Sequence, residues 1–523
     1  MFYLLSKIFK GFTRTERFLF IGAFLLFLTA SVFTTLRLYY RLTIEAPERG
    51  GRYSEAVIGQ PVFVNPLIAD DSGINRDLIE LIFSNLHSLT KNHKISPDNK
   101  VWTLTLYDNL RWHDGQPLTA EDIVFTINAI QNSETNSPQR AAWEGVAAEK
   151  LNEQEVKLVL KIPFAFFEES WRELWIAPKH IMSVVPPANL KLSNYNLEPV
   201  GSGPYRFNGL TKRKDGFITL YELAANHDYQ PAPPFIEEFQ FRFFENDEEA
   251  IGAFNQKEVG AVGGLAPEKI RKLKLTYQMF RINQPRYYGI FFNPYANPQF
   301  KEKNIRLALN YAIDKKKLLA AIFQNQAILV NGPLTPGIDG YSDGGERDFS
   351  PEKTRELLDS QGLSLNIVVP KIPFLIETVN LIKSDWEKIG AIVNPLILEP
   401  AAVHNDFIKN RNYDMIIFGN ILKDYPDIFS FWHSSERFYP GLNLALYDSK
   451  EADQLLEAIR EDLNKESRQE KVAAVQKLIR EDQPAIFLYA PHYLYAAPKN
   501  LQGFKGRFEN TAEWYLKTKR VFR

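Results

Sequence analysis

The sequence contains no cysteine among its 523 residues. A disulfide, a thiolate metal site and a cysteine nucleophile are therefore all excluded. A lipid anchor on an N-terminal cysteine is excluded for the same reason. The absence does not identify a compartment, because many exported bacterial proteins also lack disulfides.

The sequence also lacks an excess of charge of either sign. Lys and Arg number 62 and Asp and Glu number 63, so the net charge is −1. Nucleic-acid binding usually needs a basic face, and we expect no nucleic-acid partner. Only eight His residues are present, and none are paired at metal-ligand spacing. We therefore predict no metal site and no cofactor.

Catalytic motifs are missing as well. The sequence has no Gly-x-Ser-x-Gly, no His-Glu-x-x-His and no phosphate-binding loop. Gly201 and Gly203 begin a Gly-x-Gly pattern, but the third glycine is replaced by Arg206 and Pro204 would disrupt a helix start. We expect a protein that is not an enzyme.

The longest apolar run covers residues 18–36. As a helix of about 19 residues it would span roughly 28 Å, close to the hydrocarbon thickness of a bilayer. Basic residues precede it, which places residues 1–17 in the cytoplasm and the chain after Arg37 outside. A cleaved signal peptide is the alternative, but residues 29–33 offer a poor cleavage site. We favour an uncleaved single-pass anchor in the cell membrane with an extracytoplasmic C-terminal domain.

The remaining length exceeds the usual size of one hydrophobic core, so we expect two or three lobes. Residues 37–52 contain Pro, Gly and charged residues with little to bury. They are expected to form a tether, and the globular part begins at Tyr53.

The most informative stretch is residues 110–130, Leu-Arg-Trp-His-Asp-Gly-Gln-Pro-Leu-Thr-Ala-Glu-Asp-Ile-Val-Phe-Thr-Ile-Asn-Ala-Ile. The β-branched and aromatic run at 101–106 predicts a strand before it. Thr119, with Asp122 three residues later, predicts a helix start that imitates a capping box. The spacing of the three isoleucines at 123, 127 and 130 predicts one apolar helix face. By physics alone this is a strand–turn–helix corner.

The string at residues 111–126 also resembles the signature of the bacterial extracellular solute-binding proteins of family 5. That family includes oligopeptide-, dipeptide- and nickel-binding proteins of ABC importers. Further motifs follow in the family's order at residues 200–207, 304–314 and 332–337, and the resemblance covers most of residues 53–504. In the family the first string shapes a corner, so it identifies the fold and does not mark a site.

The resemblance implies a periplasmic-binding-protein-like α/β fold (type II, cluster C), with two lobes and an extra small domain. The strand–helix–strand alternation at 365–369, 374–389 and 391–398 independently indicates parallel neighbours in a sheet. The resemblance also implies that a late strand at 485–489 returns to the first lobe. The expected division is lobe I at 53–89, 196–282 and 483–523, the small domain at 90–195 and lobe II at 283–482.

A ligand is expected after the strand at 413–418, because the crevice in an open α/β sheet lies past the carboxyl ends of its strands. The resemblance places at Asp424 a carboxylate that pairs with a peptide's α-ammonium, through a charge-assisted hydrogen bond. A turn cap before Pro426 is the alternative. Asp427 is a weaker candidate that we expect to cap a helix near Phe429.

Backbone groups are the second part of the predicted site, because an extended peptide can pair with them as an added strand. The residues expected to supply these groups are Gly419, Asn420, Ile421 and Leu422 from the second lobe and Ser72 and Gly73 from the first.

Aromatic side chains form the third part. Trp432 is predicted to line the pocket, together with Trp112 and Tyr205, although aromatics at such positions are more often core residues. The group that receives a peptide's carboxylate varies within the family, and Arg286 is one candidate.

The resemblance implies a monomeric receptor for short peptides whose lobes close by hinge motion and which then docks on an ABC permease and its ATPase. A receptor for a nickel or other metal chelate, or for another small solute, is an alternative within the family. A peptide-sensing or scaffold protein without a transport role is a further alternative.

Overall fold

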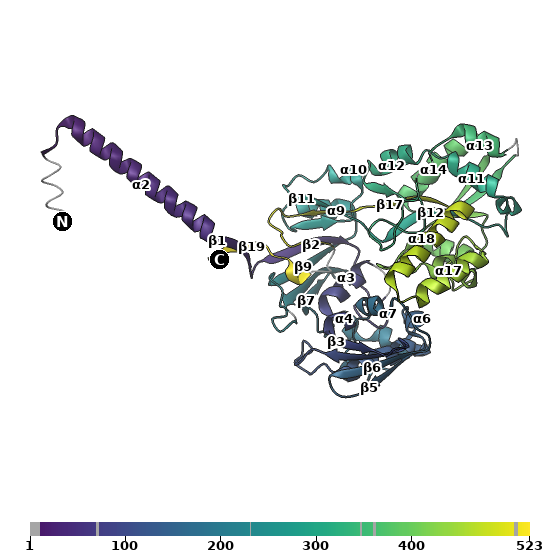
Figure 1. Ribbon diagram of the computed structural model, residues 1–523, viewed down its shortest axis with the longest axis horizontal. Helices are drawn as coiled ribbons and strands as arrows, with labels where there is room; N and C mark the ends of the chain where they lie inside the picture. Colours follow the sequence, from purple (N-terminus) through teal and green to yellow (C-terminus); the bar gives the residue numbers. More distant parts are fainter. Residues whose placement is uncertain are drawn as a thin grey trace.

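The computed structural model describes residues 11–69, 73–230, 232–345, 348–358, 362–506 and 511–522. A body of two lobes and a small domain carries one long helix that projects from it (Figure 1). Each part of the body is built on its own β-sheet.

Lobe I contains a mixed seven-stranded sheet in the order β11-β18-β10-β2-β9-β8-β7. Alternation along β9 turns Phe239, Phe241 and Phe243 into the core, where each is at most 3% exposed. Its strands are β2 (Arg52–Ile58), β7 (Tyr205–Lys212), β8 (Ile218–Ala225), β9 (Glu238–Phe244), β10 (Ala261–Gly263), β11 (Gln278–Ile282) and β18 (Tyr493–Ala497); its helices are α3 (Gly73–Ile82), α9 (Asp247–Asn255) and α10 (Pro267–Ile270).

Lobe II contains a six-stranded sheet in the order β13-β17-β12-β16-β14-β15. Strand β14 runs parallel to both β15 and β16, which confirms the parallel neighbours expected from the alternation of elements. Its strands are β12 (Arg286–Phe292), β13 (Ala327–Leu329), β14 (Ser364–Pro370), β15 (Ile392–Leu398), β16 (Met415–Ile421) and β17 (Ala485–Pro491).

Helices cover both faces of the lobe II sheet. Along β12, Ile290 and Phe292 enter one hydrophobic core while Tyr287 and Phe291 enter the other. Helices α17 and α18 lie on the side nearer the small domain (Figure 1). The helices are α11 (Lys303–Tyr311), α12 (Lys315–Phe323), α13 (Pro351–Leu358), α14 (Pro373–Glu387), α15 (Pro400–Ala402), α16 (Phe429–Trp432), α17 (Lys450–Glu461) and α18 (Lys465–Asp482).

The chain crosses between the lobes twice. The first crossing is at residues 283–285, between β11 and β12, and the second is at His492, between β17 and β18. The expected return of residues 485–489 to lobe I is corrected here, because β17 pairs with β12 and β13 in lobe II. The next strand, β18, pairs with β10 and β11 and makes the return.

The small domain is a four-stranded antiparallel sheet with short helices. Its core is continuous with that of lobe I, so the two form one packed unit. Its elements are α4 (Leu86–Leu89), β3 (Thr90–Ile95), β4 (Val101–Leu106), α5 (Ala120–Gln131), α6 (Arg140–Trp143), β5 (Val146–Lys150), β6 (Glu155–Leu160), α7 (Phe167–Ser170) and α8 (Lys179–Met182).

The start of α5 confirms the predicted corner. Thr119 caps the helix and the Asp122 side chain accepts from the Thr119 N–H at 2.9 Å, which completes a capping box. Ile123, Ile127 and Ile130 are each fully buried.

His113 joins this corner to the glycine motif at 200–207. Its Nδ1 accepts from the Gly201 N–H at 3.3 Å and its Nε2 lies 3.1 Å from the Gly203 carbonyl oxygen. A Cβ at Gly201 would lie 1.9 Å from the Ile82 carbonyl oxygen, so only glycine allows this close approach. Two motifs far apart in the sequence are thus parts of one corner at the end of α3.

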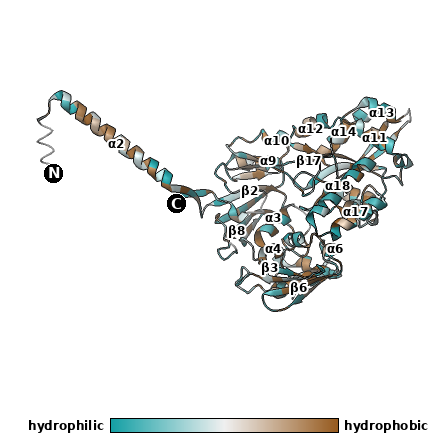
Figure 2. Cartoon of the chain, viewed as in Figure 1, coloured by the Kyte–Doolittle hydropathy of each residue, from teal (hydrophilic) through white to brown (hydrophobic). Residues whose placement is uncertain are grey.

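The projecting helix is α2 (Arg14–Leu42), a candidate membrane span with no buried residue. Hydrophobic residues cover much of its length (Figure 2). It is followed by β1 (Thr43–Glu48), which pairs along its whole length with β19 (Lys517–Phe522) near the C-terminus. The segment expected to be a tether therefore contains the last residues of α2 and one strand of a two-stranded ribbon.

Candidate functional site

The carboxyl end of β16 has an open edge. Leu422 donates its N–H to the Pro285 carbonyl at 2.6 Å, and antiparallel alternation places Asn420 in the next hydrogen-bonded pair with β12. The backbone groups of Gly419 and Ile421 therefore point the other way, towards β14. Pairing between β14 and β16 is limited to Met415 and Ile416.

The side chains around this edge are mostly structural. Asn420 is buried and donates from Nδ2 to the Tyr287 hydroxyl at 2.9 Å. Leu422 is also buried, whereas Ile421 is 44% exposed. A Cβ at Gly419 would lie 2.7 Å from Cε1 of Tyr288, so glycine is what lets that ring cover the strand. Of the four residues predicted here, Gly419 and Ile421 present free backbone at the open edge.

Asp424 follows this edge on an exposed loop. Within the described part of the chain its carboxylate makes no hydrogen bond or ion pair, so it does not cap the turn before Pro426. Asp427 has a different environment. It accepts from the Phe429 N–H at 3.3 Å and forms a two-pronged ion pair with Arg460 at 2.9 Å. Asp427 thus accepts from the first residue of α16, although the N-cap position itself is Ile428. Among the described residues of this loop, Asp424 offers the available carboxylate.

A segment of the small domain reaches across to this loop. The ring of Phe166 stacks on Tyr425 with centroids 5.0 Å apart, and Lys423 forms an ion pair with Glu173. The Ala165 N–H donates to the Arg460 carbonyl at 2.7 Å. Figure 1 shows this segment, which leads into α7, beside α17 of lobe II.

Sequence reasoning missed this contact. The one signal for it in the sequence is the apolar cluster at residues 163–167. Phe166 is 1% exposed and packs with the core of lobe II, although it belongs to the small domain. Burial also raises the pKa of the Tyr425 hydroxyl.

The predicted contribution of lobe I is only partly visible. Ser72 lies outside the described residues. Gly73 is the exposed first residue of α3, and a Cβ there would meet no atom within 4 Å.

The predicted aromatic lining is corrected by the structure. Trp432 is fully buried among Phe291, Tyr447 and Phe487, so it is a core residue of lobe II without a surface for a ligand. Trp112 and Tyr205 are at most 2% exposed and are also core residues. All three aromatic side chains contribute their buried area to the hydrophobic cores, Trp112 and Tyr205 in lobe I and Trp432 in lobe II.

Arg286 occupies the first position of β12, directly opposite Ile421. Cross-strand partners project to the same face, so its side chain lies beside the open end of β16. It is half-buried, and no ion pair or hydrogen bond of its guanidinium occurs among the described residues. The available cation of Arg286 and the available carboxylate of Asp424 thus both lie at the carboxyl end of β16.

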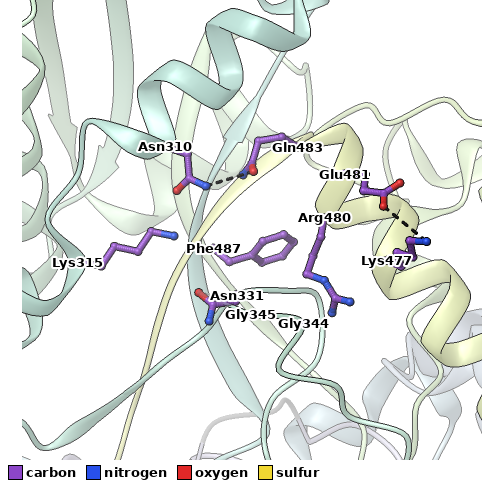
Figure 3. Close-up of a pocket in the computed structure, with 10 residues that line it drawn as sticks. All are labelled: Asn310, Lys315, Asn331, Gly344, Gly345, Lys477, Arg480, Glu481, Gln483 and Phe487. Atoms are coloured by element: carbon purple, nitrogen blue, oxygen red, sulfur yellow. Dashed lines mark hydrogen bonds and ion pairs between the residues drawn. The ribbon is translucent and has the colours of Figure 1, made fainter. Parts of the chain in front are cut away.

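A separate polar cavity of about 400 Å³ lies within lobe II, between α11, α18 and the loop after β13 (Figure 3). Asn310 donates to Gln483 at 3.2 Å inside it. None of its lining residues belongs to the β16 edge. Among the described residues, no three His, Asp or Glu side chains form a group that could hold a metal ion.

Comparison with known proteins places this arrangement in context. The chain is 26% identical to the oligopeptide-binding protein AppA of Bacillus subtilis over 513 residues, which are 90% of this chain and 92% of AppA. The solved structure of that protein in complex with a nonapeptide superimposes with a TM-score of 0.74 at 24% identity, over 90% of this chain and all of AppA.

Two further solved structures share the fold. The ABC transporter substrate-binding protein CtaP of Listeria monocytogenes is 25% identical with a TM-score of 0.80, over 90% of this chain and all of CtaP. NikZ of Campylobacter jejuni, solved in complex with Ni(L-His), is 23% identical with a TM-score of 0.73, over 89% of this chain and 99% of NikZ. The family description "Bacterial extracellular solute-binding proteins, family 5 Middle" matches residues 86–438, which is more than half of the chain. The protein therefore belongs to the bacterial extracellular solute-binding proteins of family 5.

Proposed function

We propose that this chain is a membrane-anchored, extracytoplasmic receptor that captures short peptides between its lobes and delivers them to an ABC importer. It acts by binding alone, as a monomer, and catalyses no reaction. The peptide-binding relatives support the ligand class, because AppA was solved with a nonapeptide bound.

The observation that carries the proposal is the open end of β16 beside Asp424. Gly419 and Ile421 turn backbone donors and acceptors towards the β14 side, where the pairing of β14 ends at Ile416 and no other described strand pairs with them. An extended peptide placed there would continue the sheet, as in other cases of strand addition. Its α-ammonium would pair with Asp424 and its carboxylate with Arg286, each through a charge-assisted bond.

Closure would follow from the two crossings at residues 283–285 and at His492, about which the lobes can hinge. A peptide that contacts both lobes favours the closed arrangement, because its contacts are complete only there. The Phe166–Tyr425 stack would then cover the loop that carries Asp424.

The anchor is proposed for α2. Its 29 residues rise about 44 Å, enough to cross a bilayer with its interfacial layers. Docking on a permease and its ATPase is inferred from the family.

Native mass spectrometry of the full chain, purified in detergent without refolding, tests the ligand class. We expect a ladder of peptide masses that Asp424→Asn abolishes and Asp406→Asn preserves. Asp406 is a matched control, because it is an exposed carboxylate of lobe II with no ion pair among the described residues.

Other masses would redirect the assignment. Detection of the mass of a nickel or other metal chelate would assign a different class of solute to the cleft. An empty cleft that also ignores a peptide library would count against peptide capture. Peptide binding without loss of uptake in a deletion strain would favour sensing or scaffolding over transport.

A further inference from the structure

The segment between α2 and the body is a braced junction. Arg520 of β19 donates to the Thr43 hydroxyl at 3.3 Å, pairs with Glu45 at 3.0 Å and lies over the ring of Tyr40 at 4.2 Å. These contacts tie the C-terminal strand to the last turn of α2. We call the paired strands β1 and β19, together with residues 37–42, the stem.

The stem is also fixed at its other end. Trp514, three residues before β19, is fully buried in the core of lobe I. Gly50, two residues after β1, donates its N–H to the Phe235 carbonyl at 2.7 Å. Both strands therefore enter the folded body, and Figure 1 shows the C-terminus beside the near end of α2.

Exposed apolar and aromatic side chains continue beyond the predicted span and into the stem. Leu38 is 54% exposed, Tyr40 57%, Leu42 47% and Ile44 43%. Tyrosine at such a helix end is typical of the interface between hydrocarbon and headgroups. If α2 spans a membrane, its headgroup layer meets the chain at these residues and the stem begins there.

The stem and its flanks are strongly basic. Residues 37–52 and 511–523 contain eight Lys and Arg against three Glu. Arg37, Arg41, Lys517 and Lys519 are exposed and form no ion pair with the described residues. Alternation places Lys517 and Lys519 on the face of β19 opposite Arg520, so they remain free while Arg520 braces the junction.

We propose that the stem is a binding surface for anionic phospholipid headgroups of the membrane that α2 crosses. The proposal rests on the anchoring role proposed for α2. Arg37 and Arg41 lie at the headgroup level, and the lysines of β19 extend the positive surface outward. A strand rises about 3.4 Å per residue, so Lys519, opposite Ala46, lies roughly 14 Å beyond the end of α2 at Leu42. The Debye length is about 10 Å at 0.1 M ionic strength and about 30 Å at 0.01 M, so an anionic surface attracts Lys519 most strongly at low salt.

The consequence is a receptor held against the bilayer, because a braced ribbon replaces a flexible leash. A flexible linker would allow the distance and orientation of the body relative to the membrane to vary. Here the lipid charge and the ribbon together would orient lobe I relative to the membrane.

The absence of cysteine makes the test direct, because one introduced cysteine carries one label. The full chain, labelled with a fluorophore through Thr518→Cys, is reconstituted in nanodiscs that contain a headgroup-attached nitroxide quencher. We expect several-fold stronger quenching with phosphatidylglycerol than with phosphatidylcholine alone, and its loss at 1 M salt. The charge reversals K517E and K519E together should remove the difference.

Two controls keep the outcomes separate. Reversal of Lys94 and Lys191, exposed lysines of the small domain, makes the same charge change away from the stem and should leave the quenching intact. A second label through Val32→Cys, with the nitroxide on the acyl chain, reports whether α2 is inserted. Quenching at residue 32 with equal signals at residue 518 in both lipids would overturn the lipid surface while leaving the anchor in place. No quenching at residue 32 would overturn the anchor, and the lipid surface with it.

Discussion

The ring of Phe166 stacks on the ring of Tyr425, with centroids 5.0 Å apart and planes 23° from parallel. Phe166 belongs to the small domain, which shares its core with lobe I, whereas Tyr425 belongs to lobe II. The guanidinium of Arg468 in α18 lies over the Phe166 ring, 5.0 Å from its centroid. An opening of the lobes has to expose Phe166 to water, so this stack favours the closed arrangement.

Replacement of this ring should shift the balance towards the open form. Truncation of a buried Phe to Ala typically costs about 3–5 kcal/mol, and here the loss falls on the contact between lobes. We expect Phe166→Ala to increase the radius of gyration of the ligand-free protein in small-angle X-ray scattering. Peptide affinity should fall at least tenfold, because fewer molecules are competent to hold the ligand.

Phe438→Ala is the control for this experiment, because Phe438 is a 63% exposed ring of lobe II. It should change neither the radius of gyration nor the affinity. Equal scattering curves for Phe166→Ala and the unchanged protein would mean that the stack does not govern closure.

The cation opposite Ile421 leads to a second prediction, on the peptide's C-terminus. If Arg286 receives the carboxylate, Arg286→Met removes a charge-assisted hydrogen bond worth about 2 kcal/mol. Titration calorimetry should then show roughly 30-fold weaker binding of peptides with a free carboxylate. C-terminally amidated peptides should bind both forms alike.

Arg355→Met, at an exposed position of α13, should leave both peptide classes unaffected. An equal loss for free and amidated peptides would show that Arg286 supports the strand end and does not read the carboxylate.

A third prediction concerns His113 and acid stability. Burial lowers the pKa of His113 from 6.5 to about 4 in the folded protein. Between pH 6.5 and 4 the unfolded chain therefore binds more protons than the folded protein. The contribution of His113 to the free energy of unfolding is present above pH 6.5 and is lost as the pH falls towards 4. The difference corresponds to at most about 3 kcal/mol.

Thermal unfolding between pH 7 and 4 measures this contribution. We expect His113→Gln to lower the melting temperature at pH 7 and to flatten the decline below pH 6.5, since Gln keeps hydrogen-bonding groups but does not titrate. His404→Gln, at an exposed position, should follow the curve of the unchanged protein. A decline that is identical in His113→Gln would assign the acid sensitivity to other groups.

Local features of the molecule were readable from the sequence alone. The cap at Thr119, the buried isoleucines of α5 and the parallel strands β14 and β15 depend on neighbours close in the chain. The spacing of apolar residues along the sequence indicates which face of such an element is buried. The apolar run that became α2 and the family motifs are equally local, so the family and the candidate span followed from them.

The pairings between residues far apart in the chain had no comparable signal in the sequence. Residue 166 meets residue 425, and Arg520 meets Glu45 at a sequence separation of 475. Likewise β17 reads as an apolar strand, but nothing in its residues states that it joins lobe II before the chain returns. A strand's sequence fixes which face is buried, whereas its partner depends on where the rest of the chain lies.

The candidate site shows the same division. Asp424 and the free backbone of β16 were expected from the sequence and the family, and the structure places them at one strand end. That Trp432 is enclosed, and that a ring from the small domain covers the neighbouring tyrosine, was decided by packing. An aromatic residue has the same sequence signature in a core and in a pocket, and only the surrounding atoms distinguish the two.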